Sequence, residues 1–285
     1  MQEKLGIIDV GGGYRGVYGA GVLDYCLDND IKFDVAIGIS AGSANLVTYA
    51  AGQARRTLKF YTEYGMRKEY ASVRNFIFKR SFVDLDYCYG TLSNSGGEYP
   101  LDFTAIQNNP MKFIAVATNA ITGEAKYFTA EDMAQDNYNI MKASSALPFA
   151  SPPYEIAGNL YFDGGLSDLI PIKKAFDEGC DRIVLILTKP RDTIRTPEKD
   201  TFFANRIKKK YPKAAKNLIK RAETYNNAVA LAKELEKQGK VLIVAPKDTF
   251  GVDTLTKNPE PMKKLYELGY QDGKSILNFI KKCEL

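Results

Sequence analysis

Short apolar runs alternate with longer segments whose apolar residues recur at helical spacing. Such alternation is typical of α/β proteins, in which helices cover both faces of a mainly parallel sheet. The predicted strands are 5–10, 33–39, 112–117, 125–128, 182–187 and 240–245. The predicted helices are 19–27, 41–49, most of 54–79, 214–238 and 261–282. The pattern therefore predicts an α/β fold with a mainly parallel sheet.

Two segments depart from this alternation. Residues 81–110 are rich in Ser, Gly, Asp, Asn and Tyr, which predicts a long loop or lid. Residues 202–221 hold eight Lys or Arg and no acid, in a chain of net charge +5. Two interpretations of this basic segment stay open: a contact with an anionic partner such as a phospholipid surface, or a solvated helix face. The candidate lipid contacts are Arg206, Lys208, Lys209, Lys210 and Lys213.

Histidine is absent from all 285 residues. This excludes Ser-His-Asp triads, Cys-His nucleophiles and His-ligated zinc, so catalysis must use carboxylates, Lys, Tyr or Cys. The four cysteines are far apart and form no CxxC pair, which favours reduced thiols over a disulfide framework or a zinc ribbon. We expect no metal and no cofactor.

The chain shows no targeting or membrane-spanning pattern. An acid lies among its first four residues, and the apolar run that follows stops at glycines, unlike a secretion signal. Residues 35–54 carry no charge, but several glycines and polar residues interrupt them. We expect a cytoplasmic protein that can contact a membrane peripherally, with no nucleic-acid partner.

A G-x-S-x-G motif occurs once, as Gly38-Ile39-Ser40-Ala41-Gly42. In a nucleophile elbow the serine lies on a sharp strand-to-helix turn, and small neighbours allow its strained backbone. The motif follows a predicted strand and precedes a predicted helix, which is the context an elbow requires. A glycine-rich turn with a solvent-facing Ser40 is the alternative. Ser43 would lie in the first helical turn, where serines usually cap.

A glycine loop, Gly11-Gly12-Gly13-Tyr14-Arg15-Gly16, follows the first predicted strand. It fits the G-x-G-x-x-G dinucleotide motif, but the acid that would bind a ribose is missing: Asp34 begins the second strand instead of ending it. The loop also suits an oxyanion hole, because consecutive glycines let backbone amides surround one point. Arg15 would add positive charge there or form a structural salt bridge.

One carboxylate is the best candidate for activating Ser40. Asp163 follows a short apolar segment and precedes Gly164 and Gly165, which permit unusual backbone and close approach. Asp-Gly-Gly alone is most often a turn. Asp168 is the alternative carboxylate.

Together these motifs resemble the patatin-like phospholipase family, and its bacterial branch in particular. That family has a G-G-G-x-R-G loop, a G-x-S-x-G elbow about 25 residues later and a D-G-G or D-G-A aspartate more than 100 residues downstream. The chain has all three in order, and its 143–149 stretch, Ala-Ser-Ser-Ala-Leu-Pro-Phe, is similar to a fourth family motif. The resemblance covers roughly residues 5–190.

The resemblance implies a three-layer α/β/α fold and hydrolysis of lipid acyl esters by a Ser40–Asp163 dyad. The oxyanion hole would comprise Gly11, Gly12 and Gly13 with Arg15. We expect residues 1–190 to form the acyl hydrolase domain and residues 191–285 a basic, mostly helical extension on or beside it. The substrate would be a phospholipid or another lipid ester. Two alternatives remain: an inactive lipid- or partner-binding protein, and a nucleotide-binding module that uses the Gly11–Gly16 loop.

The base also sets an expectation for pH. A free aspartate has a pKa near 3.9, so it is a weaker base than imidazole and favours esters over amides. From the sequence we expect no inflection in the pH–rate profile near pH 6.5.

Overall fold

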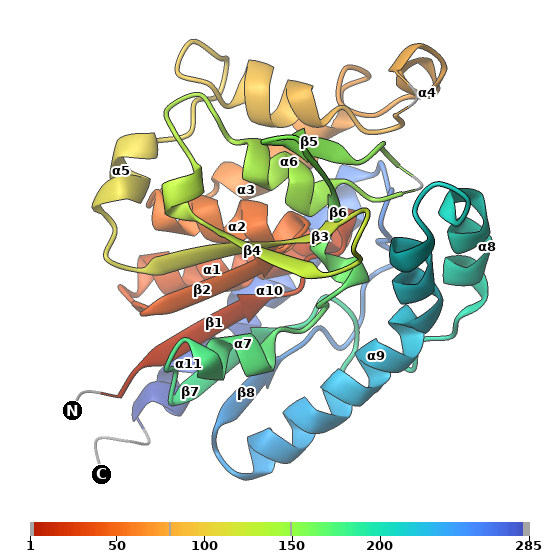
Figure 1. Cartoon of the computed structure of the whole chain (residues 1–285). Coiled ribbons are helices and arrows are strands. Elements are labelled where there is room, and N and C mark those ends of the chain that lie inside the picture. The colour runs from red at the N-terminus through yellow and green to blue at the C-terminus, as the bar shows by residue number, and fades with distance from the viewer. Residues whose placement is uncertain (1–2, 80, 149, 282–285) are drawn as a thin grey trace.

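Eight strands form one sheet at the centre of the computed structural model, which describes residues 3–79, 81–148 and 150–281 (Figure 1). The strand order is β5-β6-β3-β2-β1-β7-β8, and β4 also pairs with β3. The five strands from β3 to β8 in that order are parallel, whereas β4, β5 and β6 make antiparallel pairs. The fold is therefore α/β with a mostly parallel sheet, as predicted.

The strands are β1 (Leu5–Asp9), β2 (Val35–Ile39), β3 (Lys112–Asn119), β4 (Ala125–Thr129), β5 (Tyr154–Ile156), β6 (Asn159–Asp163), β7 (Arg182–Ile186) and β8 (Val241–Val244). The longer helices are α1 (Val17–Asp28), α2 (Ala41–Ala50), α8 (Glu198–Ile207), α9 (Pro212–Lys237), α10 (Pro259–Asp272) and α11 (Lys274–Lys281). The shorter helices are α3 (Arg56–Thr62), α4 (Val73–Lys79), α5 (Phe103–Asn108), α6 (Asn139–Ser145) and α7 (Ile172–Asp177).

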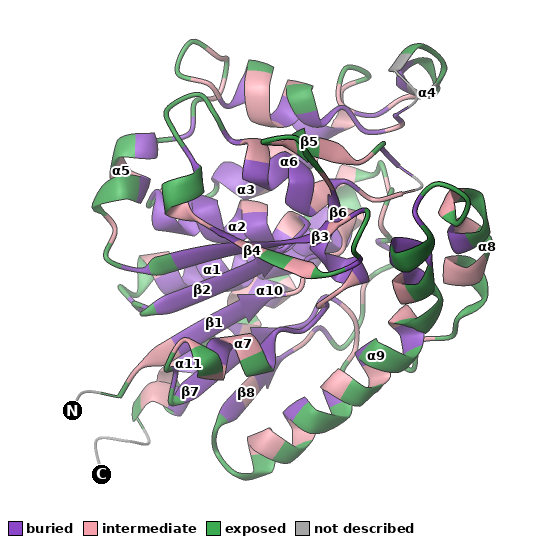
Figure 2. Cartoon of the chain, in the orientation of Figure 1, coloured by how far each residue is buried: buried purple, intermediate pink, exposed green. Residues whose placement is uncertain are grey.

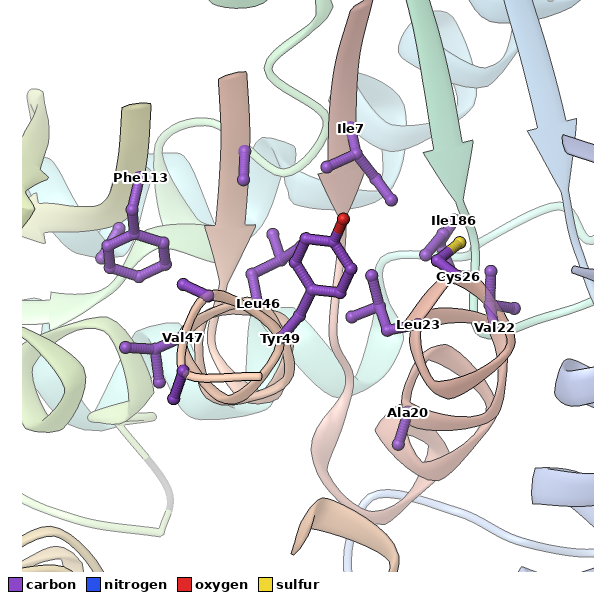
Figure 3. Close-up of a cluster of buried hydrophobic side chains, with 14 of the residues drawn as sticks. Ile7, Ala20, Val22, Leu23, Cys26, Leu46, Val47, Tyr49, Phe113 and Ile186 are labelled. Carbon is purple, nitrogen blue, oxygen red and sulfur yellow. The ribbon is translucent and has the colours of Figure 1, made fainter. Parts of the chain in front are cut away.

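Helices cover both faces of the sheet because successive side chains of a strand point to opposite faces. Ile7 packs into one buried cluster with α1, α2 and α10, and Ile8 packs into another with α7 and α9. Figure 2 shows β1, β2 and β3 largely buried between these layers, whereas β4 and β5 are mostly half-buried or exposed. In Figure 3, Leu23 of α1 and Leu46 of α2 point toward the strand that carries Ile7. The fold is thus a three-layer α/β/α sandwich.

The C-terminal segment extends the same sheet. Strand β8 pairs in parallel with β7, and helix α10 packs closely against α1. The Tyr18 hydroxyl donates to Asp272 at 2.8 Å, and the Tyr266 hydroxyl donates to Asp24 at 2.8 Å. Residues beyond 190 therefore include one strand of the sheet and part of a helical layer, while the domain boundary at 190 stays a prediction.

Several elements differ from the sequence prediction. The helical stretch 54–79 consists of α3, a 3-10 turn and α4, and the last helix is divided into α10 and α11 at Gly273. The predicted loop 81–110 contains a π-helical turn at Tyr87–Leu92 and helix α5. Helices α6, α7 and α8 and strands β5 and β6 were not predicted. Phe149, Lys282 and Cys283 lie outside the described residues.

Candidate active site

Ser40 connects β2 to α2 through a strained turn. Its backbone has φ 57° and ψ −127°, a positive-φ conformation that residues other than glycine rarely adopt. Its amide donates to the Ser144 hydroxyl at 3.0 Å. The side chain lines two pockets. This is the geometry that a nucleophile elbow requires.

Close packing explains the small residues around Ser40. A Cβ atom at Gly42 would overlap the backbone of Asp9, and one at Gly38 would overlap the backbone of Ser43. Ser43, the alternative serine, is fully buried, and its hydroxyl hydrogen-bonds the Ser144 hydroxyl at 2.9 Å. It lines neither pocket. Ser40 is therefore the serine of this motif that a substrate can reach.

Asp9 holds the glycine loop and the elbow together, although no sequence motif singles it out. It is fully buried at the end of β1. Its carboxylate accepts from the Gly11 amide at 2.9 Å and from the Asn45 side chain at 2.8 Å. Burial raises its pKa to about 6, although both hydrogen bonds oppose the rise. The only sequence signal was an acid at the end of an otherwise apolar strand.

The glycine loop leaves two amides free beside Ser40. Gly11 donates to Asp9, but within the described part of the chain the amides of Gly12 and Gly13 donate to no protein acceptor. The Arg15 side chain lies against Gly12 and is ion-paired with Asp253. The loop thus presents two N–H donors with a guanidinium next to them, a combination that can stabilise an oxyanion.

Asp163 ends β6, and its backbone pairs with Ala117 of β3. One carboxylate oxygen accepts from the Gly165 amide at 2.7 Å, and the other is buried without a hydrogen-bond partner among the described residues. Burial raises the pKa of Asp163 above its ordinary value, and the nearby Ser40 side chain, the Arg221 charge and the Gly165 amide oppose the rise. A base with a raised pKa of this kind would lose its activity at a higher pH than a free aspartate would.

Asp168, the alternative carboxylate, faces elsewhere. It accepts from the Tyr127 hydroxyl at 2.7 Å and does not line the pocket that Asp163 lines. Gly164 approaches β3 so closely that a Cβ atom would overlap the backbone of Val116. Asp163 and not Asp168 therefore shares a pocket with Ser40.

Two pockets meet at Ser40. The apolar pocket lies over α2 and α3. Its walls are mainly aromatic and aliphatic, and they include Val47, Phe60, Tyr61, Tyr70, Leu85 and Leu147. Part of the predicted loop 81–110 therefore covers this pocket. The charged pocket is lined by Asp163, Gly12 and several cations and acids.

The basic segment spans the end of α8, the following turn and the start of α9. The five candidate lipid contacts, Arg206, Lys208, Lys209, Lys210 and Lys213, are all exposed. None of them has an ion-pair partner in the part of the chain that the structure describes. Arg206 stacks on the exposed Phe202 ring at 4.3 Å. Exposure is consistent with both interpretations of this segment.

Within residues 3–79, 81–148 and 150–281, no cluster of three or more Cys, Asp or Glu residues is placed to hold a metal ion. Among the same residues, no helix has a long enough apolar stretch to cross a bilayer. Cys26, Cys88 and Cys180 are buried free thiols.

Comparison with known proteins places these features in a family context. Residues 10–176 match the family model described as patatin-like phospholipase, and residues 211–284 match a domain of unknown function, DUF6363. The chain is 29% identical over 208 residues to the uncharacterized protein YjjU of Escherichia coli. The aligned region covers 68% of this chain and 55% of YjjU.

The other relatives are longer. Lysophospholipase NTE1 of Saccharomyces cerevisiae is 27% identical over 200 residues, covering 68% of this chain and 11% of NTE1. The Coccidioides immitis NTE1 is 25% identical over 98% of this chain, which is 18% of its own length. The chain thus spans about half of YjjU and less than a fifth of these NTE1 proteins. The crystal structure of VipD from Legionella pneumophila shares the fold, with TM-score 0.50 and 13% identity over 97% of this chain and 67% of VipD.

Proposed function

Because the chain belongs to the patatin-like phospholipase family, we propose that it hydrolyses carboxylic esters of lipids with Ser40 as nucleophile and Asp163 as base. The observation that carries this proposal is the position of Ser40. It lies on a strained turn, it lines one pocket together with a buried aspartate, and it also lines an apolar pocket. An acyl chain in the apolar pocket would bring its ester carbonyl to Ser40.

In the first step the Ser40 Oγ attacks the ester carbonyl, and Asp163 takes the hydroxyl proton. The unpartnered oxygen of Asp163 is the natural acceptor, because the other oxygen is held by Gly165. The free amides of Gly12 and Gly13 would stabilise the oxyanion, each worth about 3 to 4 kcal/mol. Asp163 then returns the proton to the leaving alcohol.

Water completes the reaction by attacking the acyl-enzyme. Asp163 accepts a proton from the water and passes it to the Ser40 Oγ as the bond between Oγ and the acyl group breaks. The fatty acid then leaves, and Ser40 is regenerated. No step requires a group other than the side chains and amides already named. Even with a raised pKa, a carboxylate is a modest base at neutral pH, so esters, with their better leaving groups, are favoured over amides.

The nucleotide-binding alternative has weak support. Its ribose-binding acid would have to be Asp34, but the Asp34 carboxylate accepts from the Leu5 amide at 2.7 Å. Leu5 begins β1, so Asp34 lies at the opposite end of the strands from the glycine loop. An inactive lipid-binding protein would have the same two pockets but would not cleave esters. A measurement of ester turnover therefore distinguishes this alternative from a hydrolase.

Activity-probe labelling tests the proposal. A fluorophosphonate probe should label the wild-type protein at Ser40, as mapped by mass spectrometry, and Ser40→Ala should remove both labelling and ester turnover. Ser43→Ala is the matched control, because Ser43 lies three residues away in the same elbow but reaches neither pocket. Ester turnover that persists in Ser40→Ala, or a label on another residue, would refute the assignment.

A further inference from the structure

The charged pocket beside Ser40 contains more positive charge than the chemistry of Ser40 and Asp163 requires. Five cations and four acids line it: Arg15, Lys189, Arg195, Lys199 and Arg221, with Asp163, Glu198, Asp200 and Asp253. Two of the acids have a cation of their own. Asp253 pairs with Arg15, and Asp200 lies 3.4 Å from Arg221. Glu198 is exposed at the rim.

Lys189 and Arg195 are the half-buried cations that these acids do not pair with, whereas Lys199 is exposed. Neither has an ion-pair partner among residues 3–79, 81–148 and 150–281. The Nε atoms of Arg15 and Arg195 are buried and make no hydrogen bond within that same part of the chain. The Arg15 side chain is only 8% exposed. Buried donors of this kind are normally satisfied, so these point to a bound acceptor.

Arg195 is held in place before any ligand binds. Its guanidinium stacks on the Tyr225 ring, 3.9 Å from the ring centroid. Its backbone amide donates to the Asn226 side chain at 2.9 Å, and its carbonyl accepts from the same side chain at 3.0 Å. A guanidinium fixed in this way loses little freedom on binding, which favours tight anion recognition.

The cations also repel one another. Burial, together with the charges of Arg15, Arg195 and Lys199, lowers the pKa of Lys189 to about 8. Burial and the charges of Arg221 and Arg15 lower the pKa of Arg195 to about 10. A bound anion would relieve this repulsion, and perturbed cations of this kind cluster at functional sites.

From this geometry we infer that Arg15, Lys189 and Arg195 form a phosphate-binding subsite for the headgroup of the lipid substrate. The inference rests on the proposed function: with the ester carbonyl at Ser40 and the acyl chain in the apolar pocket, the alcohol side of the ester extends into the charged pocket. A phosphate a few bonds from the ester would then meet these donors. Arginine and lysine are the side chains that bind phosphate best.

The subsite gives a role to the chain beyond the matched family region. Lys189 and Arg195 follow residue 176, where the patatin-like match ends. Tyr225 and Asn226, which hold Arg195, belong to the domain of unknown function at 211–284. The C-terminal segment would therefore select the headgroup for a nucleophile that the N-terminal segment supplies.

Two lipids that differ only in the phosphate test the subsite: oleoyl lysophosphatidic acid and monooleoylglycerol. The specificity constant kcat/KM is measured with each lipid. The readout is the ratio of the value for the phosphate-bearing lipid to the value for the uncharged lipid. Partial misfolding does not change this ratio, because it lowers both values equally. Lys189→Gln and Arg195→Gln should each lower this ratio at least tenfold, mainly through weaker binding of the phosphate-bearing lipid. Lys247→Gln is the matched control, because Lys247 is exposed and lines neither pocket. A ratio that stays at the wild-type value in both pocket variants overturns the inference.

Inorganic phosphate separates a headgroup site from a free-anion site. Phosphate should bind the Ser40→Ala protein in calorimetry, lose that binding when Lys189→Gln is added, and compete with the phosphate-bearing lipid. If phosphate instead slows both lipids equally while Lys189→Gln leaves the ratio unchanged, the site takes a free anion and the headgroup assignment is wrong. If the protein cleaves no ester, the proposed function fails, and calorimetry alone still decides whether the subsite binds phosphate.

Discussion

The two pockets that share Ser40 are built by opposite means. The apolar pocket has aromatic and aliphatic walls from α2, α3 and the segment 81–101, which bury surface without demanding a particular orientation. The charged pocket has cations from the loop after β7 and from α9, and carboxylates from β6, from α8 and from Asp253. These groups demand a partner of defined charge and shape. The apolar pocket therefore suits an acyl chain of variable length, and the charged pocket suits a polar group of defined charge and shape.

The two pockets also come from different parts of the chain. The walls of the apolar pocket lie mostly between residues 13 and 150, whereas the excess cations of the charged pocket follow residue 188. Thr254 lines both pockets, and its carbonyl accepts from the Tyr14 amide at 3.3 Å. Changes at Ser40 or Asp163 should therefore affect every substrate, and changes within one pocket should affect only part of the substrate.

Asp163→Asn should have the largest effect. The amide cannot accept the Ser40 proton, so kcat should fall about 10³-fold, within the range that a general base contributes. Because the dyad serves both pockets, phosphate-bearing and uncharged esters should lose activity equally. Steady-state kinetics with both lipids measures this. Asp168→Asn is the matched control, since Asp168 faces Tyr127. An unequal loss would mean that Asp163 also binds one of the substrates.

Ala44→Phe should separate the pockets by filling one of them. Ala44 lines the apolar pocket from α2 and is partly exposed to it. Each methylene group of a long acyl chain that can no longer be buried costs about 0.8 kcal/mol of binding free energy. If the new side chain excludes two or three methylene groups from the pocket, the preference for long over short acyl chains should fall about 30-fold. The measurement is kcat/KM for a palmitoyl ester divided by that for an acetyl ester.

The control is a larger side chain in the charged pocket, on the other side of Ser40. Ile194→Phe enlarges a side chain that lines the charged pocket and is 73% exposed. It should leave the palmitoyl-to-acetyl ratio unchanged. Equal effects of Ala44→Phe and Ile194→Phe on that ratio would contradict the assignment of the acyl chain to the apolar pocket.

Arg221→Gln should shift the pH dependence. Asp163 works as a base only when ionised, so the rate falls as the pH drops through its pKa. The Arg221 charge lowers that pKa against the effect of burial. Removing the charge should move the acidic limb of kcat/KM upward, toward neutral pH. Arg221→Lys keeps the charge and should restore most of the wild-type limb. A downward shift in Arg221→Gln would contradict Asp163 as the base.

The sequence predicted those parts of the site that local motifs encode. The elbow and the glycine loop follow apolar strands, and small residues at fixed spacing mark both. The carboxyl ends of β1 and β2 meet at one edge of the sheet, which brings the glycine loop beside Ser40. Asp163 was predicted by its turn motif and by the resemblance. Their roles in catalysis stay predictions.

Contacts between segments distant in sequence could not be predicted. Asp9 was not singled out, because its partners Gly11 and Asn45 meet only after β1 and β2 pair. The charged pocket was missed for the same reason: Lys189 and Arg195 carry no motif, and only the packing of the segment after β7 on α9 brings them to Ser40. The basic segment 202–221 stood out in the sequence by its charge, but it lies mainly outside both pockets.

Lys209→Gln should have the smallest effect and decide between the two interpretations of that segment. Lys209 is exposed and lines neither pocket. If the segment contacts an anionic membrane, each basic residue near the surface adds about 1 kcal/mol, so binding to phosphatidylserine vesicles in a sedimentation assay should weaken about fivefold. Turnover of a soluble acetyl ester should not change, because the site lies elsewhere. The matched control Lys247→Gln should bind as wild type does. Equal vesicle binding by all three proteins would favour a solvated helix face and leave the charged pocket as the place where this chain recognises phosphate.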